Sequence, residues 1–323
     1  MCANVRHTFI RIRRVFRTIS FVFHFFQMYR WNQIFIACHK SFFIIFGLFG
    51  NIHLIYIILS TPTFRSKSSY LQCIQSSAQC FCILNSFIDV YLMITNTEIL
   101  RETCFNIIFF NIFCYCVQSS IMFFILLDIL IITLFPLVHR NLSNCKYVVA
   151  MSIVPVLWGI FIVAWGFQGK DFTSFKLCST MIALRLPTRQ VLAPVIVTFN
   201  SLSLVVFLIL IMVFWKKGQN KGDSYKIMRH LKVSAALFII SNYLSAFAIN
   251  IFILFGYSGE DLTNMIGNIS ISSMFSYSHT FYTIIWRSKE YRKRFIGLYC
   301  KTSTPGVTFF VPTVIKNKAQ SEF

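Results

Sequence analysis

Residues 126–140 read LLDILIITLFPLVHR, and they place one acidic side chain, Asp128, near the end of a long apolar run. The apolar residues continue to Pro136, and the basic pair His139 and Arg140 follows. A carboxylate inside a helix of membrane length is costly unless it has a partner or a function. The stretch therefore predicts the end of a transmembrane helix in which Asp128 is a functional residue.

The composition of the 323-residue chain indicates a membrane protein with several spans. Apolar residues make up 56% of it and charged residues 12%, which is more apolar side chain than one soluble core of this length could bury. The net charge is +20, and in a membrane protein such an excess belongs to loops that face anionic lipid. We therefore expect a lipid bilayer as partner, and no nucleic acid.

Seven runs with few or no charged residues are long enough to cross about 30 Å of hydrocarbon. They cover approximately residues 34–60, 70–95, 105–135, 147–168, 190–215, 233–257 and 262–286. With the N-terminus outside, the inner loops carry most of the basic residues, especially those between 216 and 232 and from 287 onward. The positive-inside rule then predicts an all-α membrane protein, a seven-transmembrane helix bundle with its N-terminus out and its C-terminus in.

The segments outside the bundle are basic. Residues 1–33 form an N-terminal arm, and its charge opposes an outside location. A start at Met28 is the favoured interpretation, and a signal peptide and an interfacial helix are the alternatives. Residues 287–300 predict a short helix in the inner membrane interface, with Tyr291, Phe295 and Ile296 toward the membrane. Cys300 is a candidate for palmitoylation, and a cytoplasmic tail, 301–323, follows.

An ordered set of short motifs carries a resemblance to a known family. GLFGN (47–51) lies in the first span. FRSK precedes the second span and CIQ lies near its start. The third span region carries RETCF, QSSIM, LD and FPL in that order, and RSKEYRKRF follows the last span at 287–295. The set resembles the rhodopsin-like G-protein-coupled receptors and, more narrowly, the nematode serpentine chemoreceptors of the Srsx class. It covers roughly residues 42–300, so residues 34–286 are expected to form the receptor domain.

The resemblance implies a disulfide and a ligand site at the outer end. Cys104 lies just outside the third span and Cys178 lies in the longest outer loop, and the resemblance implies that these two positions are joined. Asn111 lies two turns after Cys104 on the same helix face. Amine-binding relatives carry a carboxylate there, so Asn111 disfavours a monoamine. The ligand is expected to be a small molecule or peptide, and the candidate binding residues are Asn111, Tyr115, Gln118, Tyr243, Phe247 and Asn250.

The resemblance also implies that the inner end couples to a heterotrimeric G protein. In relatives an arginine follows the acid of the third span, but Ile129 follows Asp128 here, so coupling is in doubt. Asp128 needs another donor, and the cations nearest in sequence are Arg140, Arg65 and Lys67. The candidate residues that face the G protein or act as a switch are Asp128, Ile129, Arg140 and Tyr282.

Two amides are expected to pack helices together. Asn51 lies in the middle of the first span, where an amide needs a partner on another helix. Gln79 stands where many relatives carry a buried aspartate that helps to hold sodium, so we expect no sodium site.

Other functional classes find little support in the sequence. It carries no nucleophile motif, metal-spaced His/Cys set or phosphate-binding glycine loop, so we expect neither an enzyme nor a metal or other cofactor. The alternative to a receptor is a ligand-gated channel or a small-solute transporter. Such proteins usually place several ionisable groups at mid-membrane or repeat one half of the chain. The expected location is the plasma membrane, in the cilia or dendrites of sensory neurons if the family analogy holds.

Overall fold

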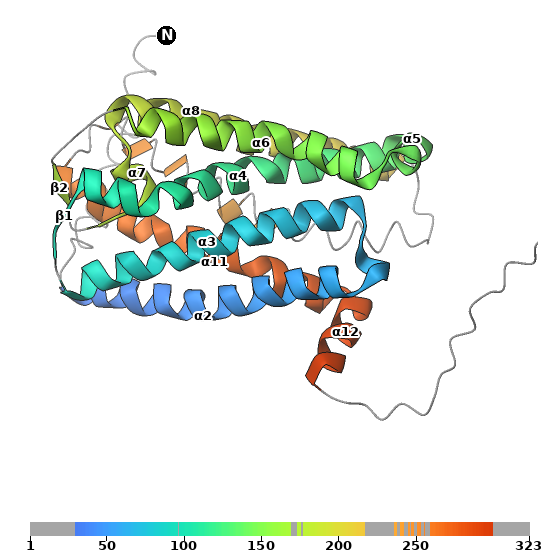
Figure 1. Ribbon diagram of the computed structural model, residues 1–323, viewed down its shortest axis with the longest axis horizontal. Coiled ribbons are helices and arrows are strands. Elements are labelled where there is room, and N and C mark those ends of the chain that lie inside the picture. The colour runs from blue at the N-terminus through green and yellow to red at the C-terminus, as the bar shows by residue number, and fades with distance from the viewer. Residues whose placement is uncertain are drawn as a thin grey trace, which may run out of the picture.

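The computed structural model describes residues 30–95, 97–168, 173–175, 177–216 and 259–299, together with isolated positions between 236 and 255. Its long helices run side by side along the longest axis of the molecule (Figure 1). They are α2 (Arg30–Ser60), α3 (Lys67–Thr95), α4 (Arg101–Leu134), α6 (Asn144–Gly166), α8 (Leu186–Lys216) and α11 (Gly259–Arg287). The predicted all-α fold is confirmed.

The helices coincide with the apolar runs because a bilayer offers no partner to a free backbone N–H or C=O group. Among the described residues, the helices α2, α3, α4, α6 and α8 are long and apolar enough to cross a membrane. Helix α11 has 29 residues and covers the predicted seventh span. The predicted sixth span, 233–257, falls mainly outside the described residues, as do most of residues 1–33 and all of 301–323.

Helix α4 ends where proline forces it to end. Phe135 precedes Pro136 and has φ −130° and ψ 61°, because a proline ring clashes with an α-helical residue before it. The short helix α5 (Pro136–Asn141) starts with that proline, which is well suited to the first helical position. The chain direction therefore changes just after α4, and this brings the residues of α5 back toward the bundle.

Helix α4 is central in the packing, with α3, α6 and α8 against it, while α2 packs on α3 and α11. One end of the bundle carries the two-stranded antiparallel sheet of β1 (Ile99–Leu100) and β2 (Ser174–Phe175), with the short helix α7 (Thr180–Ala183). The opposite end carries α5, the 3-10 turn η1 (Pro62–Phe64) and α12 (Lys289–Tyr299) (Figure 1). We call them the disulfide end and the Asp128 end.

Helix α12 is present after α11, but its aromatic residues do not point where we expected. Tyr291 stacks on Phe64 with ring centroids 4.3 Å apart, and Phe295 packs at 5.3 Å from Phe281 of α11. Burial against this surface raises the pKa of the Tyr291 hydroxyl. The expectation that Tyr291 and Phe295 face the membrane is therefore wrong, because the end of the bundle offers them an apolar surface; Ile296 is exposed.

The glycines of the GLFGN motif allow α2 to approach α11. A Cβ atom on Gly47 would lie 2.5 Å from Ser278 Oγ and 2.6 Å from Ile83 Cδ1. A Cβ atom on Gly50 would lie 3.0 Å from the Phe281 Cβ. Small residues at such positions let helix backbones come close, which is how membrane helices gain packing energy.

Gly47→Ala should lower the thermal stability of the purified protein, because the new methyl group has no space between α3 and α11. Overpacking of this kind costs about 1–3 kcal/mol. Gly297→Ala is the matched control, since a Cβ atom at Gly297 meets nothing within 4 Å. Equal melting temperatures for the two variants in detergent would contradict the packing argument.

Candidate functional site

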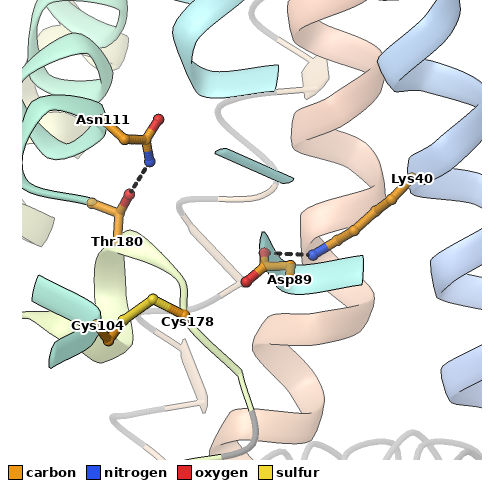
Figure 2. Close-up of a disulfide and its surroundings, with 6 residues drawn as sticks. All are labelled: Lys40, Asp89, Cys104, Asn111, Cys178 and Thr180. Atoms are coloured by element: carbon orange, nitrogen blue, oxygen red, sulfur yellow. Dashed lines mark hydrogen bonds and ion pairs between the residues drawn. A yellow bond between two sulfur atoms is a disulfide. The ribbon is translucent and has the colours of Figure 1, made fainter. Parts of the chain in front are cut away.

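The disulfide end is closed by a covalent bond between α4 and the segment before α7. Cys104 and Cys178 form the predicted disulfide, with their Cα atoms 5.6 Å apart (Figure 2). Both cysteines are buried in an apolar cluster that includes Ile108, Leu177 and Met181. The bond fixes the start of residues 177–183 over the end of α4.

Hydrogen bonds hold the same segment further along α4. The Asn111 side-chain amide donates to Thr180 Oγ1 at 3.3 Å, as Figure 2 shows. The β1–β2 ladder adds an attachment upstream, where Arg101 N–H donates to the carbonyl of Thr173 at 2.9 Å. Asn111 thus joins α4 to the loop segment.

A buried ion pair lies beside this loop, and the sequence analysis did not select either partner. Lys40 of α2 donates to Asp89 Oδ2 of α3 at 2.8 Å (Figure 2). Lys40 is 1% exposed and Asp89 is 5% exposed. The pair therefore joins α2 to α3 beside the disulfide-bonded segment.

A pocket of about 100 Å³ opens between the ion pair and the loop. Its walls come from α2, α3, α4, α7 and α11, so most of the described bundle contributes to it. Its polar lining includes Lys40, Asn85, Ser86, Asp89, Asn111, Tyr115, Ser179, Thr180, Ser270 and Ser273. A concave site with a few convergent polar groups is the usual form of a ligand site.

The structure brings together only part of the predicted ligand set. Asn111 and Tyr115 line the pocket. Gln118 is 1% exposed, is not among the lining residues, and its amide has no hydrogen-bond partner among the described residues. Phe247 is 45% exposed and lies away from the pocket lining. Tyr243 and Asn250 lie outside the described residues.

The two amides in the middle of the bundle behave differently. Asn51 is fully buried and donates from Nδ2 to the carbonyl of Tyr277 in α11 at 2.9 Å. It therefore links helices as expected. Gln79 is also fully buried, but neither of its polar side-chain atoms has a hydrogen-bond partner among the described residues.

Asp128 lies at the other end of α4 and is fully buried. Its Oδ1 is 3.0 Å from His139 Nε2 of α5, and its Oδ2 accepts a hydrogen bond from the hydroxyl of Ser68 in α3. The His139 ring packs edge-on against Tyr147 with centroids 5.1 Å apart. The carboxylate therefore has partners on both sides, which its burial requires.

The cations expected to pair with Asp128 are used elsewhere. Lys67 donates to the carbonyl of His139, and Arg65 donates to the carbonyl of Leu59 at 3.1 Å. Arg140 is exposed. Those expectations were wrong because the break at Phe135 turns α5 back and brings His139, rather than its neighbour, to the carboxylate.

The remaining predicted switch residues do not contact the carboxylate. Ile129 is half-buried and packs against apolar clusters that include Leu126 and Ile125. Tyr282 donates from its hydroxyl to the carbonyl of Phe46 in α2 at 2.8 Å, so it joins α11 to α2. The described part of the Asp128 end is therefore organised around Asp128, His139 and Ser68.

The sequence contained a signal for the ion pair that was missed. Leaving histidines aside, Lys40 is the single charged residue of the first predicted span, and Asp89 is the single one of the second. Two opposite charges in adjacent spans are expected to pair, because each is costly alone. His139 had no comparable signal, because its approach to Asp128 depends on the turn after α4.

A comparison with protein families identifies the bundle. The family model described as serpentine type 7TM GPCR chemoreceptor Srsx matches residues 44–299, which is most of the chain. No curated protein matches the chain significantly.

Cys104→Ser and Cys178→Ser should lower surface expression equally, and the double variant should be no worse, because the two halves of one bond do not add. Loss of such a disulfide costs about 2–5 kcal/mol of stability. Cys145→Ser is the control, since Cys145 is free and exposed. Labelling of a tagged receptor on intact cells measures the effect, and clearly additive losses would argue against the pairing.

His139→Leu should destabilise the protein by about 1–3 kcal/mol, because it leaves a buried carboxylate short of a partner. Arg140→Leu, at the exposed neighbour, should have little effect. Adding Asp128→Asn to His139→Leu should restore part of the loss, since the uncompensated charge is then gone. Thermal unfolding of the purified variants tests this, and no coupling between the two positions would rule out the interaction.

Proposed function

Because the chain belongs to the Srsx family of serpentine seven-transmembrane chemoreceptors, we propose that it is a chemosensory receptor that binds a small molecule or peptide at its disulfide end. Ligand binding there would be passed along the helices to a heterotrimeric G protein at the Asp128 end. The observation that carries the proposal is the family match over residues 44–299. A receptor family, rather than a channel, carrier or enzyme family, fits the chain.

The arrangement of the disulfide end supports ligand binding there. The pocket lies between several helices that are far apart in the sequence, so a ligand in it would touch elements that must move relative to one another. The bond between Cys104 and Cys178 favours an outer location for this end, because disulfides persist on the oxidising side of the membrane. The basic loops favour an inner location for the opposite end, with the N-terminus outside.

Coupling at the Asp128 end would differ from that of most relatives. The arginine that usually follows the acid is replaced by Ile129, which has neither charge nor donor. The carboxylate is paired with His139 and Ser68 instead. We propose that these contacts hold the resting state and that coupling is weak without the arginine.

The remaining parts of the proposal follow from the family. The chain is a multi-pass membrane protein, and we propose the plasma membrane of sensory neurons as its location. The exposed residues of α12 would lie at the inner membrane interface, and Cys300, which lies outside the described residues, remains the candidate for palmitoylation. Arg140 is exposed and would be available to the G protein.

Ile129→Arg should raise both basal and stimulated G protein activation, because it supplies the arginine that follows the acid of the third span in relatives. Allosteric couplings of this kind amount to about 1–3 kcal/mol, so the increase should be about fivefold or more. The measurement is nucleotide exchange on the G protein at matched surface levels of receptor.

Ile129→Leu is the control, because it keeps the volume and adds no charge. It should behave like the wild type. Strong coupling of the wild-type receptor that Ile129→Arg leaves unchanged would show that the missing arginine does not limit signalling. A response to Ile129→Leu as large as that to arginine would assign the effect to packing.

A further inference from the structure

The charges in the pocket at the disulfide end cancel. Among the described residues that line it, the charged ones are Lys40 and Asp89. They form one ion pair, 2.8 Å long, with both side chains almost completely buried. A ligand with a single net charge would therefore bring an uncompensated charge into a desolvated site, which is costly.

The ion pair does not use all of its hydrogen-bonding capacity. Asp89 binds Lys40 through Oδ2, while its buried Oδ1 has no hydrogen-bond partner among the described residues. The Lys40 ammonium has three N–H donors, and the described residues account for one of them. A free carboxylate oxygen and free ammonium donors therefore lie together at the wall of one pocket.

The opposite wall adds further unpaired acceptors. Asn111 donates to Thr180, but its Oδ1 has no partner among the described residues. The hydroxyl of Ser179 also has no hydrogen-bond partner among the described residues. Buried polar atoms are normally paired, and a ligand with hydrogen-bond donors in this cavity would supply partners for Asp89, Asn111 and Ser179.

We propose that this pocket binds a small zwitterion, an amino acid or a molecule of the same chemistry. Its ammonium group would bind Asp89 Oδ1 and the neighbouring acceptors, and its carboxylate would bind the free donors of Lys40. The assignment rests on the proposed receptor function and narrows it. A zwitterion satisfies both charges at once and leaves the net charge of the site at zero.

The size of the pocket limits the ligand. A cavity of 150 Å³ holds benzene, so about 100 Å³ accommodates roughly four to six non-hydrogen atoms. Glycine and L-alanine are of this size. A monoamine could pair with the Asp89 carboxylate but offers no acceptor to the Lys40 ammonium. This agrees with position 111, where amine-binding relatives carry a carboxylate and this chain carries Asn111.

The test uses the purified full-length chain in detergent and the shift of its melting temperature with added ligand. The probes are glycine and L-alanine as zwitterions, with n-butylammonium as a cation and propionate as an anion of similar size. The wild type should be stabilised by the zwitterions at about tenfold or more lower concentration than by either ion. Asp89→Asn should shift the preference to propionate, and Lys40→Gln should shift it to n-butylammonium.

The double variant Lys40→Gln and Asp89→Asn keeps the volume, removes both charges and should lose the preference altogether. If a single variant fails to fold, the double variant still tests the zwitterion proposal, because it leaves no buried charge unpaired. The proposal is overturned if neither zwitterion stabilises the wild type, if all probes act equally, or if the preference survives in the double variant. A purely structural ion pair would not reverse selectivity in this manner.

This measurement does not depend on a G protein. Zwitterion binding with no G protein response to any ligand would refute the proposed function and leave the pocket assignment standing. A G protein response without zwitterion binding would refute the pocket assignment and leave the proposed function standing.

Discussion

Burial of charge constrains both ends of this bundle. A carboxylate removed from water must find a donor, since an unpaired one costs several kcal/mol. Asp89 meets the requirement with Lys40 across the α2–α3 interface, and Asp128 meets it with His139 and Ser68. The first pairing joins α2 to α3, and the second joins α4 to α5 and to α3.

The disulfide end combines a rigid cover with a polar interior. The bond at Cys104 and the hydrogen bond between Asn111 and Thr180 hold the loop segment on α4. Beneath it, Lys40 and Asp89 join α2 to α3 at the wall of the pocket. A ligand that disturbs the ion pair would therefore act on both helices at once. This gives a physical route from occupancy of the pocket to a change in helix packing.

Several contacts stabilise the Asp128 end. Lys67 donates to a backbone carbonyl in α5, and α12 packs Tyr291 and Phe295 into an apolar cluster with residues of α2 and α11. Ile129 lies in an apolar environment beside Asp128, so this end lacks a cation next to the carboxylate in sequence. Arg140 remains exposed nearby. Movement of α5 would break the contact between His139 and Asp128.

The sequence alone determined the helical architecture, because apolar runs without charge have no other stable form in a bilayer. It also predicted Asn51 as a packing residue, Cys104 with Cys178 through a family resemblance, and Asn111 as part of a pocket. It did not determine the partner of Asp128, since the backbone break at Phe135 selects His139 over Arg140. It did not reveal that Tyr291 packs inward, and although lone opposite charges in adjacent spans indicate that Lys40 and Asp89 pair, it did not reveal that the pair lines a pocket. Such contacts join residues far apart in the chain or beyond a turn, and only tertiary packing brings them within hydrogen-bond distance.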